Sequence, residues 1–243
     1  MEFKLPTETI ELPSRGVLYP EGHPLSGGTI EMKYMTAKEE DILTNQNYIR
    51  QGVVIDKLLQ SLIVTDVDYN DILIGDKNAI MLAARILSYG KDYEFTYGGV
   101  PQMADLSAFD AKPLDETKYT KGVNQFEYVL PTSNIPLTFR LLTHKDEKAI
   151  EAEIKGLQKI NKDNIAEATT RLKYMITSIN GSSETKDIRQ FVDNAFLARD
   201  ARAFRQHYAE LEPNVDFTTS VTVNGVEEDV DLPITLNFFW PES

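Results

Sequence analysis

The chain has 243 residues, of which 42% are hydrophobic and 26% are charged, as in ordinary globular proteins and unlike disordered or fibrous chains. Its formal net charge of −13 disfavours nonspecific binding to nucleic acids and to acidic membranes, because both carry negative charge. The absence of cysteine excludes disulfides, thiol nucleophiles and cysteine-bound zinc. The negative charge either keeps the protein soluble or steers a basic partner towards it.

The order of sequence patterns predicts an α+β fold in four regions. Residues 1–28 are expected to form an extended arm, because proline and glycine recur there and disfavour a long helix. Residues 29–142 form a mixed region with short strands, residues 143–212 a helical region, and residues 213–243 a β-hairpin with an aromatic tail. No apolar run approaches the roughly 20 residues of a membrane span, and no signal-peptide pattern is present, so we expect an intracellular protein.

The mixed region begins with a strand and continues with helices. Residues 29–34 alternate as a strand, and a helix then starts at Thr36, whose spacing to Glu39 is that of a capping box. Apolar periodicity predicts further helices over residues 53–63 and from residue 76 to a stop at Gly90.

Segments with the alternation of strands follow the helix that ends at Gly90. Residues 93–97, 126–130 and 135–142 are predicted to be strands. The intervening residues 98–124 are expected to be irregular, with one short helical turn near Asp105.

The C-terminal half is predicted to be mainly helical. Helices are expected over residues 143–160, 163–179 and 197–211, and another helix is expected to start at a Ser183 cap. Asn224-Gly225 lies between two alternating segments, which predicts a tight hairpin because the turn needs positive φ at both positions.

Residues that carry catalysis or bind metals are scarce. His23, His144 and His207 have no metal-ligand spacing, and the chain lacks a phosphate-binding loop and a nucleophile elbow. The aspartates within residues 66–71 lack the glycine and glutamate of a calcium loop. We therefore predict no catalytic site, cofactor or metal. An enzyme with an unrecognised carboxylate site is the alternative, which a carboxyl group of raised pKa in a deep pocket would support.

Three arginines are the first candidate surface for protein contacts. Arg199, Arg202 and Arg205 lie three residues apart, so they share one side of a predicted helix in an otherwise acidic protein. This arginine ridge is either a solvated face with local ion pairs, since Asp200 is adjacent, or a docking surface for acidic groups.

Three consecutive aromatic residues near the C-terminus are the second candidate. Phe238, Phe239 and Trp240 cannot all point to one side of a strand. Either two of them anchor the tail on the core, or at least one is presented to a partner, because aromatic residues dominate interface hot spots.

The order of several segments resembles that of the baseplate hub family of T-even-type phages, which have contractile tails. The resemblance covers nearly the whole chain. The segments that carry it are residues 12–19, 30–32, 36–43, 73–77, 85–90, 139–143, 232–234 and 238–241.

The resemblance implies a non-enzymatic structural or assembly protein of the hub. Its expected partners are other tail or hub proteins, including the tape-measure protein, and its expected location is the host cytoplasm during assembly and then the tail baseplate. A tail-assembly chaperone that binds the tape-measure protein and is absent from the mature virion is the alternative. The expected contact residues are Pro13, Arg15, Leu18, Tyr19, Arg199, Arg202, Arg205, Phe238, Phe239 and Trp240.

Related chains often carry paired cysteines in the C-terminal hairpin, which suggest a zinc ribbon. Here the hairpin has Thr218, Ser220, Asn224 and Val226, none of which supplies a thiolate. A cysteine-free ribbon is therefore expected, and zinc is not.

Overall fold

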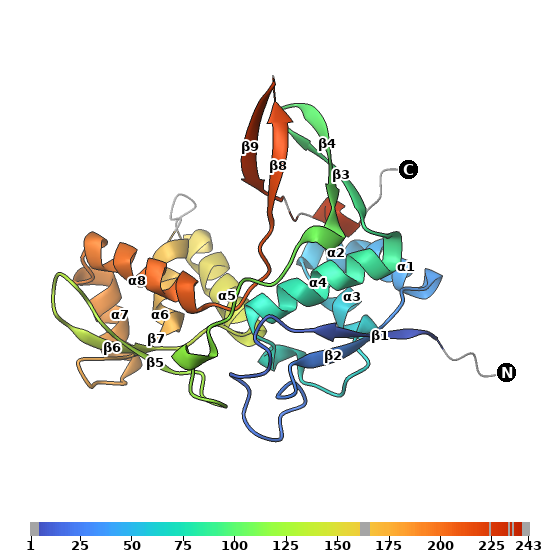
Figure 1. Cartoon of the computed structure of the whole chain (residues 1–243). Helices are drawn as coiled ribbons and strands as arrows, with labels where there is room; N and C mark the ends of the chain where they lie inside the picture. The colour runs from blue at the N-terminus through green and yellow to red at the C-terminus, as the bar shows by residue number, and fades with distance from the viewer. Residues whose placement is uncertain (1–4, 161–165, 224, 233, 235, 240–243) are drawn as a thin grey trace.

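The computed structural model describes residues 5–160, 166–223, 225–232, 234 and 236–239. It has the predicted α+β fold, and Figure 1 shows two lobes from which a pair of hairpins projects. The helices are α1 (Ala37–Leu43), α2 (Gln46–Gln51), α3 (Val54–Leu62), α4 (Ile74–Tyr89), α5 (His144–Ile160), α6 (Glu167–Met175), α7 (Thr185–Asn194) and α8 (Ala198–Leu211). The strands are β1 (Thr7–Glu11), β2 (Thr29–Lys33), β3 (Asp92–Tyr97), β4 (Val100–Asp105), β5 (Phe126–Val129), β6 (Pro136–Phe139), β7 (Ile176–Ile179), β8 (Thr218–Val223) and β9 (Val226–Asp231).

The N-terminal lobe joins the antiparallel β1–β2 pair to helices α1 to α4 (Figure 1). Ile10 on β1 lies opposite Ile30 on β2, and residues 12–28 connect the two strands. Helix α3 buries Leu58 and Leu59 completely, on the apolar stripe that its sequence predicts. Burial of this stripe, rather than the intrinsic helix propensity of nine residues, stabilises so short a helix.

Helix α1 begins with the predicted capping box. The Thr36 N–H donates to Glu39 Oε2 at 2.9 Å, and Lys33 Nζ donates to Glu39 Oε1 at 2.8 Å. Burial raises the pKa of the Glu39 carboxyl, but the hydrogen bonds from Lys33 and Thr36 outweigh it and lower the pKa to about 2. The start of α1 is thus tied to the end of β2 by a buried carboxylate.

The C-terminal lobe packs helices α5 to α8 against a three-stranded antiparallel sheet in the order β5-β6-β7. Phe139 on β6 and Phe204 on α8 are fully buried, and their rings meet edge to face with centroids 5.1 Å apart. Such a contact adds to the free energy of area burial, so these two rings join α8 to the sheet.

The paired hairpins, β3–β4 and β8–β9, lie side by side and rise from the body of the molecule (Figure 1). β8 pairs with β9 in the register expected for a two-residue turn, with Val223 opposite Val226. β4 lies beside β8, where Gln102 Nε2 donates to the Thr222 carbonyl at 3.2 Å. The two hairpins therefore form one projecting unit.

Four segments differ from the sequence prediction. Residues 100–105, expected to be irregular, form β4, because a chain that leaves β3 through the Gly98–Gly99 turn pairs back on it. The helix predicted over residues 163–179 ends at Met175, since the apolar segment that follows pairs with β6 as β7. Strand β1 and helix α2 were not predicted.

The cap of one helix also differs. Helix α7 has its N-cap at Glu184, and not at Ser183. Ser182 provides the local hydrogen bonds instead, because its hydroxyl donates to Asp187 Oδ2 at 2.6 Å and accepts from the Glu184 N–H.

Candidate docking surfaces

The predicted arm folds back onto the start of helix α4. Asp76, in the first turn of α4, is fully buried and accepts hydrogen bonds from the Ser14 N–H at 2.9 Å, the Ser14 hydroxyl at 2.7 Å and the Tyr19 hydroxyl at 2.8 Å. The Tyr19 oxygen in turn accepts from the Leu73 N–H at 3.0 Å. Burial raises the pKa of Asp76, and the hydrogen bonds from Ser14 and Tyr19 oppose that rise. Residues 12–19 are thereby fastened to α4.

Because residues 12–19 pack on α4, only some of the predicted arm residues are exposed to solvent. Pro13, Leu18 and Tyr19 are buried within the chain itself. Arg15 is exposed, and its guanidinium lies 3.5 Å from the exposed carboxylate of Glu116. Among the arm residues expected to contact partners, Arg15 is thus the accessible one.

The arginine ridge lies on the solvent-facing side of helix α8. Arg199, Arg202 and Arg205 are all exposed, and none has an ion pair with any residue that the structure describes. By contrast, Arg140 and Arg189 each donate two hydrogen bonds to one carboxylate. The ridge spans roughly 9 Å along the helix axis, at about 1.5 Å per residue.

Asp200 does not neutralise the ridge, although it is adjacent in sequence. Its side chain is fully buried and accepts hydrogen bonds from the Thr132 N–H at 2.8 Å and the Ser133 N–H at 3.0 Å. The carboxylate therefore secures the turn between β5 and β6, and the three arginines keep their net positive charge.

An apolar groove of about 410 Å³ lies between α6 and α8, next to the ridge. Leu172 and Met175 belong to the helix face that periodicity predicts to be core, and Leu172 is 4% exposed while Met175 is partly buried against the core; both also line this groove. Arg171 at its edge is paired with Glu167 at 3.4 Å, whereas Arg205 at the opposite edge is unpaired among the described residues. The groove therefore combines an apolar floor with a basic edge. Its full lining is Glu167, Ala168, Arg171, Leu172, Met175 and Arg205.

Two of the three aromatic residues in the tail anchor the chain on its own core instead of facing a partner. Phe238 and Phe239 lie in the short helix η4 (Leu236–Phe239) and are 0% and 1% exposed. The Arg85 Nε donates to the Phe238 carbonyl at 2.8 Å, and the ring of Tyr93 meets that of Phe238 edge to face. Trp240 lies outside the described residues.

A cluster of titratable groups joins the two lobes. Lys77 Nζ on α4 lies 3.0 Å from Asp56 Oδ1 on α3, 3.5 Å from Glu147 Oε2 on α5, and 3.2 Å from His144 Nδ1. The Tyr69 hydroxyl donates to Asp56 at 3.1 Å. Burial, and then the charge of Lys77, lower the pKa of His144, which favours its neutral form. The cluster ties α3, α4 and α5 together through contacts that occupy its charged groups.

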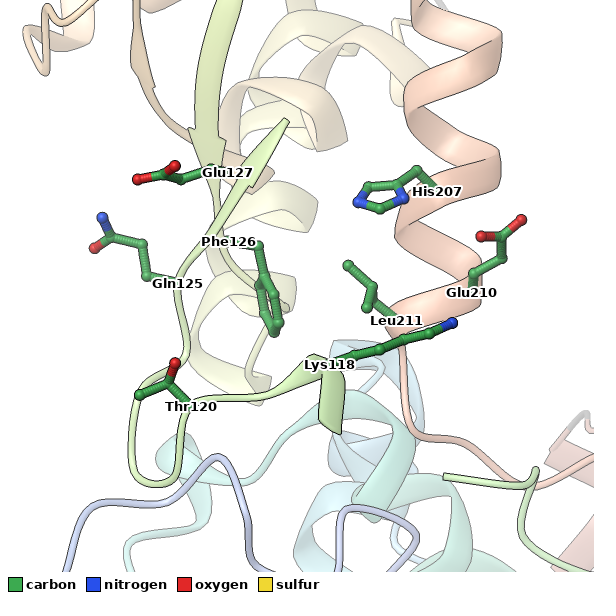
Figure 2. A pocket seen from close by; sticks show the side chains of 8 residues that line it. All are labelled: Lys118, Thr120, Gln125, Phe126, Glu127, His207, Glu210 and Leu211. Atoms are coloured by element: carbon green, nitrogen blue, oxygen red, sulfur yellow. The ribbon is translucent and has the colours of Figure 1, made fainter. Parts of the chain in front are cut away.

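A second pocket, of about 470 Å³, lies between β5 and α8 (Figure 2). His207 lines it, with its ring stacked on Tyr128 at 4.5 Å, and burial lowers its pKa. Figure 2 shows Gln125 and Glu127 pointing away from His207. Gln125 and Glu127 are therefore not positioned to pair with this histidine, and the nearby charge of Glu210 opposes the lowering of its pKa.

Metal-binding clusters and membrane-spanning helices are both absent from the described part of the chain. No group of three or more histidine or acidic side chains is arranged there to hold a metal ion. Within the same residues, no helix combines the length and the apolar character that crossing a bilayer requires.

Comparison with known proteins identifies the family. The family model described as T4 bacteriophage base plate protein matches residues 9–240, which is nearly the whole chain. Neither the curated proteins nor the solved structures contain a significant match. The match supports a structural protein of the phage tail baseplate that contacts other tail proteins, and it confirms the baseplate part of the resemblance. The chain belongs to the family of the T4 bacteriophage base plate protein.

Proposed function

We propose that the chain is a non-enzymatic structural or assembly protein of the baseplate hub, and that it binds other tail proteins through the arginine ridge and the adjoining groove. The observation that carries this proposal is the set of three exposed arginines without a carboxylate partner in the described structure, on a chain of net charge −13. Family membership supports contacts with tail proteins in general.

The chemistry of the ridge favours an acidic, partly apolar partner. Arginine is enriched in interface hot spots, because its planar guanidinium binds carboxylates in a bidentate manner while its stem packs on apolar groups. The groove beside Arg205 offers such an apolar neighbour in Ala168 and Met175. An ion pair formed there is shielded from water, and it is stronger than an exposed surface pair.

The test is a pull-down from infected cells with the tagged full-length chain. The triple variant Arg199→Glu, Arg202→Glu and Arg205→Glu is expected to lose the tail proteins that the wild type retains. The matched control reverses the three exposed cations Lys38, Arg50 and Lys186, which changes the net charge equally. Retention of every tail protein by the ridge variant would contradict the proposal.

A chaperone for the tape-measure protein is the second candidate function, and the apolar floor of the groove is the observation that favours it. Mass spectrometry of purified virions separates the two. A retained chain supports the structural role in the hub, whereas a chain found in infected cells but not in virions supports the chaperone.

A further inference from the structure

The free end of the paired hairpins combines apolar and acidic side chains. Val226 is 65% exposed and Val100 is 37% exposed, and both flank the hairpin turns. Strand β9 carries exposed carboxylates at residues 227–229 and at Asp231, and neither β8 nor β9 has a basic residue. The hairpin tip thus combines exposed apolar side chains with carboxylates next to them. It is defined here as Val100, Val226, Glu227 and Glu228.

The hairpin tip is held firmly by the base of the hairpins. Val221 is 2% exposed, and Leu232, just after β9, donates its N–H to the Phe217 carbonyl at 2.9 Å. Phe238 and Phe239, beyond β9, are then buried in the body. An element that is already ordered loses little conformational entropy on binding, which favours association.

We infer that the hairpin tip binds the groove between α6 and α8 of a second copy of the chain. The inference rests on the proposed function, because it names a partner for the same surface. Two properties match: the valines suit the apolar surface of Ala168 and Met175 in the groove, and the carboxylates of Glu227 and Glu228 suit Arg205 at its edge, with Arg202 one turn away on the same helix. Charge complementarity of this kind fixes both the partner and its orientation.

The same chain carries both complementary surfaces, and the tip does not lie against the groove of its own chain, so the partner is a second copy. Figure 1 shows the paired hairpins rising from the body, while α6 and α8 lie in the C-terminal lobe. The contact joins two different surfaces, so it builds a ring or an open chain of copies and not a two-fold dimer. Repulsion between chains of like net charge is screened beyond about 8 Å at physiological ionic strength. The contacts between tip and groove therefore determine whether two copies associate.

Sedimentation of the purified full-length chain tests the inference. The wild type is expected to exceed the 27.5 kDa monomer mass as concentration rises, and to return to it at high salt. A tip variant, Glu227→Lys with Glu228→Lys, and a groove variant, Arg202→Glu with Arg205→Glu, are each expected to remain monomeric. Reversal of the exposed Glu11 and Glu21 is the charge-matched control for the tip variant and should leave association unchanged.

Mixing the two variants gives the sharpest result. Each retains one intact surface, so the mixture is expected to regain a species of at least twice the monomer mass. Circular dichroism shows whether each variant is folded, and the salt dependence of the wild type tests the contact without any substitution. A wild type that stays monomeric at all concentrations, or a mixture that stays monomeric although the wild type associates, would overturn the inference. Loss of tail proteins in the pull-down with the ridge variant would still support the proposed function in that case, because that assay measures other partners.

Discussion

Substitution of Asp76 by alanine tests how the N-terminal segment is held on helix α4. The change removes the acceptor of three buried donors: the Ser14 N–H, the Ser14 hydroxyl and the Tyr19 hydroxyl. A buried donor without a partner costs roughly 1–3 kcal/mol, while removal of a buried carboxylate relieves part of its own desolvation cost. We expect a net decrease of about 3 kcal/mol in the free energy of unfolding.

Urea denaturation followed by circular dichroism measures this change. Trypsin adds a local measurement, because the exposed Arg15 lies within the segment that Asp76 fastens, and its cleavage should accelerate in the variant. The control is Asp66→Ala, which removes an exposed carboxylate with no hydrogen bond or ion pair in the described structure. If Asp76→Ala unfolded within about 0.5 kcal/mol of the control, the carboxylate would not be what holds the segment.

Three other substitutions probe separate parts of the fold, each measured by urea denaturation. Gly75→Ala should cost roughly 1–3 kcal/mol, because its Cβ would lie 1.6 Å from the Pro213 carbonyl oxygen and force the backbones apart. Phe238→Ala should cost roughly 3–5 kcal/mol through the cavity it leaves, and should expose the β8–β9 hairpin to proteolysis. Glu39→Gln should cost up to roughly 3 kcal/mol at pH 7, because the folded state lowers the carboxyl pKa from 4.5 to about 2. The lowered pKa stabilises the fold above pH 4.5, so the difference between Glu39→Gln and wild type should shrink as pH falls from 4.5 towards 2.

Each of these results has a matched comparison. Gly156→Ala, on α5 with open space around its Cβ, should be neutral or stabilising where Gly75→Ala is harmful. Phe238→Leu keeps most of the apolar volume and should cost less than the alanine variant. For Glu39, an unchanged difference from wild type between pH 7 and pH 2 would show that its ionised form does not stabilise α1.

The arginine ridge illustrates how far local sequence patterns lead. The spacing of Arg199, Arg202 and Arg205 was enough to predict that they share one helix face, and the structure confirms their exposure. Adjacency suggested Asp200 as a local partner, but this carboxylate binds two backbone N–H groups 67 and 68 residues away. The groove beside the ridge is not predicted by the sequence, because apolar periodicity in α6 shows which face packs on the core but not where that core lies open to solvent.

Capping boxes, apolar periodicity and the Asn-Gly turn depend on residues within a few positions of one another. The sequence alone therefore predicts α1, α3, α4, α5, α8 and the C-terminal hairpin. Contacts between distant segments depend on free energies gained only when the whole core forms, and no local pattern encodes them. Because Ser14 pairs with Asp76, 62 residues away, part of the expected extended arm is a buried segment. In the same way, residues 176–179 pair with β6 although their periodicity favours a helix, because the rest of the fold places them beside the unpaired backbone groups of an exposed strand edge.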